Sequence, residues 1–129
     1  MLITNKRPPN YAMIVRHLRP QKGTVFAYGY MLYNPSGGEI PEDVLVHEQV
    51  HERQMTDMHP DMWWIKYCTN SFFRERMEAE AFREQYQWVA KQVDETSAEM
   101  CLQDLAVDLS KNYKLDISFK KAYNIIYEK

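Results

Sequence analysis

The sequence predicts a mostly helical α+β domain, in which a small β-hairpin or sheet packs on one central helix. Two observations support this fold class. Apolar residues recur at helical spacing over most of the chain after residue 41, whereas residues 24–33 alternate as in a strand. The 129 residues indicate a single domain, 1–129, and an apolar content of 45% is enough for a core.

The strands are expected in the N-terminal part of the chain. Residues 1–10 are predicted to be an irregular lead-in that ends at Pro8 and Pro9. Residues 11–18 are rich in β-formers and are predicted to form a first strand, followed by turn residues at 19–23. Residues 24–33 are expected to pair with that strand as a hairpin.

The rest of the chain is predicted to be helical, at about 41–56, 61–68, 71–93, 97–110 and from 118 onward. Pro41 suits a first helical position, and Glu42 and Asp43 place negative charge in the first turn. Ser71 and Ser118 are expected to cap their helices. The aromatic residues of the second helix are expected to be core rather than a ligand cage: Trp63, Trp64 and Tyr67.

A metal-site pattern lies inside the helix at 41–56, in the run His47-Glu48-Gln49-Val50-His51. Two histidines four residues apart project from one face of a helix, so both imidazoles can reach one metal ion. Zinc accepts such nitrogens and keeps one position open for water in catalytic sites. Glu48 would lie beside the metal and take a proton from that water. The alternative is an ordinary amphipathic helix whose histidines bond polar groups of the core.

A third zinc ligand is expected downstream. His59, eight residues after His51, does not fit the known spacings and is predicted to lie in a loop. Glu78 and Glu80 are better candidates, but they point in different directions, about 200° apart around a helix. Glu78 shares its face with alanine and phenylalanine, whereas Glu80 has charged neighbours, which favours Glu78 as the ligand.

This combination resembles the gluzincin metallopeptidases, in particular the small minigluzincin-like zincins and related small zincins of bacteria and phages. The resemblance covers about residues 24–92, and its strong part is the His-Glu-x-x-His pentapeptide. It implies that His47, His51 and Glu78 bind Zn²⁺ and that Glu48 is the general base. The chain would then be a hydrolase that cleaves peptide bonds of a peptide or protein substrate.

One position departs from the family. Many gluzincins have an acidic or amide residue four positions after the ligand glutamate, where it supports a histidine, but this chain has Phe82 there. The resemblance also implies a sheet edge that pairs with substrate, for which the strand at 24–33 is the candidate, with Ala27 and Gly29 permitting close approach. Those small residues would equally suit packing of the helix. For the oxyanion the sequence leaves several candidates open: Tyr28, His59, Tyr67 and Tyr113.

Two other functions remain open from the sequence. One is a zincin-like fold that serves as a non-catalytic binding or regulatory module, and the other is a helical interaction protein with a chance motif. The intact Glu48 argues against the first of these. Zinc content and the dependence of hydrolysis on Glu48 would separate the three.

Charge and cysteine content argue against a nucleic-acid-binding protein and against a disulfide-linked one. The net charge is −2 and basic residues are scattered, so nucleic-acid binding is not expected. Arg74, Arg76 and Arg83 alternate with glutamates and are predicted to form a solvated helix surface. Cys68 and Cys101 are expected to be free thiols. Neither a signal peptide nor a membrane-spanning run is evident, so we expect a cytoplasmic location without membrane association. The oligomeric state stays open.

Overall fold

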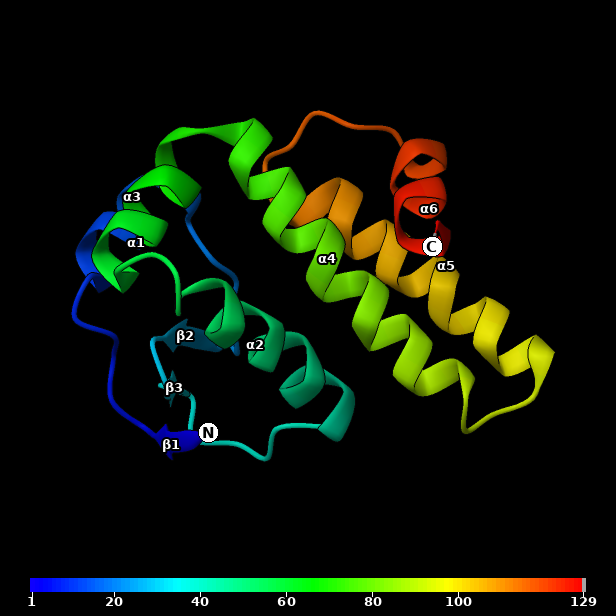
Figure 1. Ribbon diagram of the computed structural model, residues 1–129, viewed down its shortest axis with the longest axis horizontal. Coiled ribbons are helices and arrows are strands. Elements are labelled where there is room, and N and C mark those ends of the chain that lie inside the picture. The colour runs from blue at the N-terminus through cyan, green and yellow to red at the C-terminus, as the bar shows by residue number, and fades with distance from the viewer. Residues whose placement is uncertain (129) are drawn as a thin grey trace.

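The computed structural model describes residues 1–128 of the chain (Figure 1). Within this range lie six helices and one three-stranded sheet, which confirms the predicted mostly α form of an α+β fold. The elements in chain order are β1 (Leu2–Thr4), α1 (Tyr11–Leu18), β2 (Phe26–Tyr28), β3 (Met31–Tyr33), α2 (Glu42–Gln54), α3 (Pro60–Thr69), α4 (Ser71–Ala90), α5 (Glu95–Asn112) and α6 (Phe119–Tyr127).

The prediction of a strand at residues 11–18 was wrong, because this segment is helix α1. Tyr11, Ile14 and Leu18 follow the spacing i, i+3, i+7 and therefore share one helix face. Ile14 is buried at 1% exposure, and the other two pack against the same core cluster. Burial of this face explains why helical periodicity prevails over the β-formers in the segment.

The hairpin lies entirely within residues 24–33, which were predicted to be one strand. β2 and β3 pair antiparallel, with Tyr28 opposite Met31, and Gly29 and Tyr30 form the two-residue turn between them. Gly29 has a φ of 61°. A two-residue hairpin turn with positive φ at its first central position favours glycine there. Gly29 thus divides the alternating segment into two short strands.

The third strand, β1, lies in the segment predicted to be irregular. It pairs parallel to β3, with Ile3 opposite Leu32, so the strand order is β1-β3-β2. β3 is therefore the central strand, and Leu32 on it is fully buried. β2 is an edge strand and contacts α2, so the sheet packs on the motif helix as predicted.

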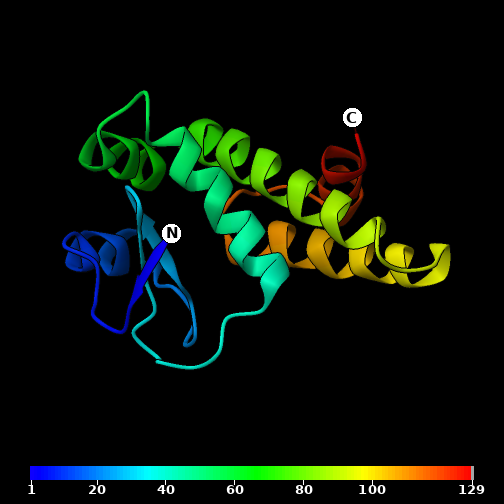
Figure 2. The same cartoon turned by 60° about the horizontal axis from the view of Figure 1, so that its bottom comes forward.

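α1 and α3 pack with the sheet on one side of the molecule, and α5 and α6 pack with α4 on the other side. The contact between α2 and α4 joins the two sides. α2 lies along α4, while α4, α5 and α6 pack together on the other side, as Figures 1 and 2 show. One core cluster joins the sheet, α1 and α3 and includes Trp63. A second core cluster lies between α4, α5 and α6 and includes Leu102. The facing surfaces of α2 and α4 lie where these two cores approach each other.

Helix ends agree with the sequence in part. Ser118 caps α6 as predicted, because its Oγ accepts a hydrogen bond from Lys121 N at 3.0 Å. α4 is capped by Asn70 and not by Ser71, since Asn70 Oδ1 accepts from Phe73 N at 3.0 Å. The aromatic residues of α3 are buried core, as expected. Among residues 1–128 no helix is both long and apolar enough to span a membrane.

Candidate metal centre

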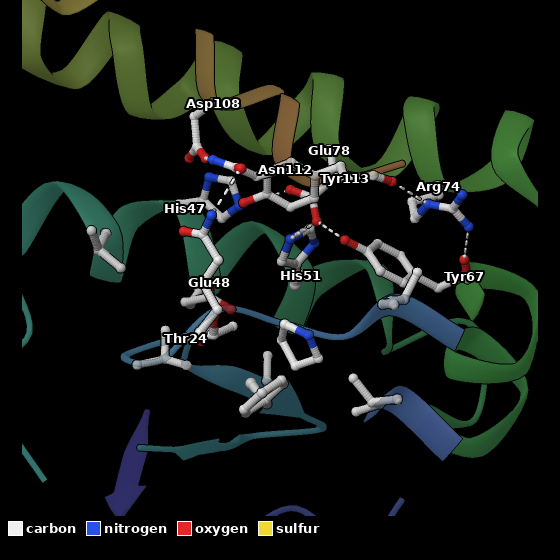
Figure 3. A pocket seen from close by; sticks show the side chains of 18 of the residues that line it. Thr24, His47, Glu48, His51, Tyr67, Arg74, Glu78, Asp108, Asn112 and Tyr113 are labelled. Carbon is white, nitrogen blue, oxygen red and sulfur yellow. Dashed lines mark hydrogen bonds and ion pairs between the residues drawn. The ribbon is translucent and has the colours of Figure 1, made fainter. Parts of the chain in front are cut away.

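α2 and α4 bring together three side chains that can each offer a metal ligand atom: His47, His51 and Glu78 (Figure 3). The histidines lie one turn apart on the face of α2 that contacts α4, and Glu78 faces them from α4. Their ligand atoms all lie within 4.8 Å of one another. All three residues are buried, with at most 5% exposure.

Glu78 lies between the two imidazoles. His47 Nε2 is 2.9 Å from Glu78 Oε1, and His51 Nε2 is 3.3 Å from Glu78 Oε2. The hydroxyl of Tyr67, on α3, donates a hydrogen bond to Oε2. The ring centroids of His47 and His51 are 5.0 Å apart and the rings are nearly perpendicular, with Nε2 of each ring facing the carboxylate.

The charges of the three groups depend on one another. Burial works to lower the pKa of both histidines, but the Glu78 carboxylate prevails and raises the pKa of His47 and that of His51, the latter to about 9. Burial likewise works to raise the pKa of Glu78, yet His51 and His47 hold it well below its usual range. The metal-free site therefore favours protonated histidines around an ionised carboxylate.

This donor set suits a divalent metal ion. Two imidazole nitrogens and one carboxylate oxygen are ligands that zinc accepts in three-ligand catalytic sites. Without a metal, the Nε2 lone pairs and the Glu78 carboxylate are all hydrogen-bond acceptors, so a proton must lie on each Nε2 to make their contact favourable. A cation at the centre of the triad would replace those protons and satisfy the same three atoms. The residues present therefore fit a zinc ion.

Glu48 follows His47 in α2 and lines the same cavity (Figure 3). It is buried, with 8% exposure, and its carboxylate has no hydrogen-bond partner among residues 1–128. Burial raises the pKa of Glu48, and His51 and His47 offset part of that rise. A carboxyl group with a raised pKa and unused lone pairs is suited to take and return a proton.

The cavity at the triad has a volume of about 330 Å³. Part of its wall is apolar, with side chains from α1, β2, α2, α3 and α4: Ile14, Leu18, Phe26, Val44, Trp63, Trp64 and Phe82. Other lining residues are polar and come from the α1–β2 loop and the end of α5: Gln21, Thr24, Asp108, Asn112 and Tyr113. The ligand atoms thus open into a space large enough for part of a peptide.

The other acidic and histidine candidates lie elsewhere. Glu80 is exposed and accepts a hydrogen bond from Gln54 Nε2 at 2.8 Å, so it is not part of the triad. His59 precedes α3, where Nδ1 accepts from Asp61 N at 3.1 Å. Phe82 packs its ring edge-on against His47, with centroids 4.6 Å apart, so the position four residues after Glu78 forms an apolar wall beside that histidine.

The structure also distinguishes the four oxyanion candidates by their hydrogen-bond partners and their exposure. The Tyr67 hydroxyl is bonded to Glu78, and the Tyr28 hydroxyl donates to Asp61 Oδ1 at 2.5 Å. His59 is exposed. Tyr113 lines the cavity, and its hydroxyl has no hydrogen-bond partner within the described chain. Burial and then Glu78 raise the pKa of Tyr113 well above the ordinary value, which keeps it a hydrogen-bond donor.

The edge of β2 is only partly open. Trp64 Nε1 donates to Ala27 O at 2.9 Å, so α3 covers the edge at that residue. Gly29 lies in the hairpin turn, and a Cβ there would be 3.6 Å from Pro60 Cγ. Val25 lies two residues before Ala27, so its backbone groups point to the same edge of the sheet as those of Ala27. Val25 also lines the cavity. Its backbone groups have no hydrogen-bond partner in residues 1–128.

Sequence reasoning missed several residues behind the site. Arg74 was predicted to be solvated, but it is buried and donates to the carbonyls of Tyr67, Tyr113 and Lys114. It therefore ties α4 to two tyrosine-bearing segments of the site. The only sequence signal is its position four residues before Glu78, which places both on one helix face.

Two glutamines were also missed. His47 Nδ1 is 2.9 Å from Gln85 Oε1, and His51 Nδ1 is 2.8 Å from Gln54 Oε1. Gln54 lies three residues after His51, and Gln85 lies seven residues after Glu78, so each shares a face with a ligand. Glutamine is common on exposed helix faces, which is why this spacing alone does not single them out.

No family model, curated protein sequence or solved structure matches the chain. The resemblance to gluzincins therefore stays a prediction that rests on the motif.

Proposed function

We propose that the protein is a zinc-dependent hydrolase of peptide bonds, in which His47, His51 and Glu78 bind zinc and Glu48 is the general base. One observation carries the proposal. Two helices direct three zinc-type ligand atoms and one unpartnered buried carboxylate into a single cavity. A structural ion-pair network would explain the triad alone, but it gives no reason to bury Glu48 with no hydrogen-bond partner among residues 1–128.

The chain's own residues would divide the work. Zinc at the triad would supply Lewis acidity to a water molecule and to the substrate carbonyl. Glu48 would accept the proton of the attacking water and deliver it to the leaving amine. Tyr113 would donate a hydrogen bond to the developing oxyanion, because it is the one candidate tyrosine whose hydroxyl has no partner within residues 1–128. The apolar wall around Trp63 would exclude bulk water.

Substrate would be a peptide or an unfolded segment of a protein. An extended chain could pair with the unpartnered backbone groups of Val25, although Trp64 limits this pairing to the part of the edge before Ala27. Nucleic acid is not an expected partner, given the net charge of −2. The cytoplasmic location stays a prediction, consistent with the free thiols of Cys68 and Cys101.

The test is hydrolysis of an unstructured protein such as casein by zinc-loaded wild-type protein and by Glu48→Gln. Glutamine keeps the size of the side chain but cannot accept the proton. We expect the substitution to leave zinc content intact and to lower hydrolysis by about 10²–10⁴-fold, the usual contribution of acid–base catalysis. Gln49→Glu is the matched control, since Gln49 is the exposed next residue on α2 and should change hydrolysis little. Equal turnover by Glu48→Gln and wild type would refute the role of Glu48.

The alternative is a metal-binding module without turnover, and one observation favours it. Gln21 Nε2 donates to Asn112 Oδ1 at 3.0 Å, which joins the α1–β2 loop to the end of α5. Both residues line the cavity, so their bond restricts access to it. If zinc-loaded wild-type protein hydrolyses neither casein nor a mixed peptide library, this alternative replaces the hydrolase.

A further inference from the structure

The outer nitrogen of each ligand histidine faces a glutamine. Gln85, on α4, lies behind His47, and Gln54, at the end of α2, lies behind His51, with the two distances already given. Gln85 is buried and Gln54 is half-buried. These side chains hold the position that a carboxylate usually occupies behind a metal-bound histidine.

The direction of each amide is fixed by a group that can only accept hydrogen bonds. Gln85 Nε2 donates to Asp43 Oδ2 at 2.8 Å. Gln54 Nε2 donates to Met77 O at 3.1 Å and to Glu80 Oε1 at 2.8 Å. Ionised carboxylates and backbone carbonyls have no proton to give, so the amide nitrogen must face them. Each amide oxygen is thereby turned toward its histidine.

A histidine that faces an amide oxygen must donate through that nitrogen. Nδ1 of His47 and Nδ1 of His51 therefore each keep their proton when the ring loses one. The proton that each ring gives up to a metal is then the one on Nε2, the nitrogen that faces Glu78 and the centre of the triad. Both rings thus present the tautomer that a metal needs.

We propose that Gln85 and Gln54 are positioning residues for the metal, and that Asp43 and Glu80 act on the metal through them. Each side of the site is a relay of carboxylate, amide and imidazole: Asp43–Gln85–His47 and Glu80–Gln54–His51. The inference rests on the proposed metal site and deepens it. It also gives Glu80 a role in metal binding although Glu80 does not touch the metal.

The relays orient the two histidines without adding another buried charge beside Glu78 and Glu48. The buried centre already contains Glu78 and Glu48, and further buried carboxylates would be costly to desolvate. Neutral amides orient the imidazoles without adding charge. The carboxylates of the relays lie farther out, since Asp43 is half-buried and Glu80 is exposed. Water can therefore solvate the charges of Asp43 and Glu80, while the hydrogen bonds through the glutamine amides orient the histidine rings.

The test measures zinc affinity by competition with a chromogenic chelator, which needs no catalytic activity. Gln85→Met and Gln54→Met keep the chain length but remove the amide. Loss of such a support typically weakens metal binding about 10–100-fold, which is the result expected for each variant. Asp43→Ala and Glu80→Ala should have smaller effects in the same direction, because they remove only the orientation of the amide.

Matched controls remove the same charges without touching a relay. Glu42 precedes Asp43 in the first turn of α2 and is exposed, so Glu42→Ala controls for helix charge. Glu84 on α4 pairs with Arg53 on α2, so Glu84→Ala controls for a link between the same helices. Both controls should bind zinc as wild type does.

A pair of double variants separates orientation from packing. In Asp43→Asn/Gln85→Glu, the asparagine can donate to the new carboxylate, which still accepts from His47. In Asp43→Asn/Gln85→Met, no acceptor faces His47. We expect the first to bind zinc at least as tightly as wild type and the second about 10–100-fold more weakly. Equal zinc affinity of these two variants would overturn the relay, whatever the stability of the single variants.

The failure of the relay and that of the metal site give different results. If wild-type protein binds no zinc at all, both the proposed function and the relay are wrong. If wild-type protein binds one zinc, and the methionine variants of Gln85 and Gln54 bind it equally tightly, only the relay is wrong. Thermal unfolding of the zinc-free variants verifies that each compared protein is folded.

Discussion

Tyr67 on α3 donates its hydroxyl to Glu78 Oε2, the carboxylate oxygen that also faces His51 Nε2. The ring of Tyr67 is stacked on Trp63 with centroids 4.8 Å apart, which holds the hydroxyl in place. Glu78 is therefore fixed from a third element in addition to α2 and α4. A carboxylate held in one rotamer by a buried donor is a pre-organised ligand.

Tyr67→Phe should weaken zinc binding about tenfold, because it removes the hydroxyl that holds the ligand carboxylate. It should also lower the stability of the zinc-free protein by about 1–3 kcal/mol, the usual effect of leaving a buried polar group unsatisfied. Chelator competition and urea unfolding measure the two effects. Tyr28→Phe, which removes a hydroxyl bonded to Asp61 away from the triad, is the control and should leave zinc affinity unchanged.

Glu78→Gln should reduce zinc affinity by orders of magnitude, because it removes the one anionic ligand of the triad. Glu80→Gln should reduce it far less, since Glu80 contacts Gln54 and not the ligand atoms. Zinc titration of both variants measures the difference. A larger loss from Glu80→Gln than from Glu78→Gln would contradict the geometry of the site.

The five helices after residue 41 were predictable because the spacing of their apolar residues and their capping residues are local features of the sequence. The strands were less predictable, because their pairing partners are distant in the sequence. β1 exists through its parallel pairing with β3, about thirty residues away, and nothing in residues 1–10 alone indicates that partner. α1 was mistaken for a strand because the propensities of its residues were weighed above the spacing of Tyr11, Ile14 and Leu18.

The centre of the site followed from spacing, whereas its surroundings did not. His47 and His51 lie on one face by helix geometry, and the apolar neighbours of Glu78 indicated the side of α4 that turns inward. The structure brings these three together. Arg74 and Gln85 could not be assigned, because their partners come from other elements and the same residue types also occur on exposed helix faces.

Tyr113→Phe should lower the rate of peptide hydrolysis and leave zinc affinity unchanged. The reason is that Tyr113 lines the cavity and its hydroxyl has no hydrogen-bond partner within residues 1–128, and that no atom of the metal triad is bonded to this hydroxyl. Loss of one oxyanion donor typically costs about 10²–10³-fold in kcat, and a single tyrosine should fall within or just below that range. An unchanged kcat would leave the oxyanion to a backbone donor or to the metal alone.

The stability of the metal-free protein should depend on pH through His51. Burial works to lower the pKa of His51, but Glu78 raises it from 6.5 to about 9. The folded pKa is thus higher than the unfolded one, so protonated His51 stabilises the fold fully below about pH 6.5 and this contribution is lost as the pH rises through 9. Urea titrations should show a falling free energy of unfolding between these values.

The decline should be smaller in His51→Gln, which has no proton to lose. Zinc affinity should change in the opposite direction over the same range, because each histidine must release a proton before it can bind the metal. A metal-free protein whose free energy of unfolding rises from pH 6.5 to 9 would contradict the assigned pairing of His51 with Glu78.

Elemental analysis of the purified protein measures how many zinc ions each chain binds. Wild-type protein should retain one zinc per chain after dialysis, and His47→Ala/His51→Ala should retain almost none. The chain has four histidines, so His17→Ala/His59→Ala is a matched control that removes the two exposed ones and should retain zinc. Wild-type protein without zinc, or equal zinc in wild type and in His47→Ala/His51→Ala, would show that His47 and His51 do not form a zinc site.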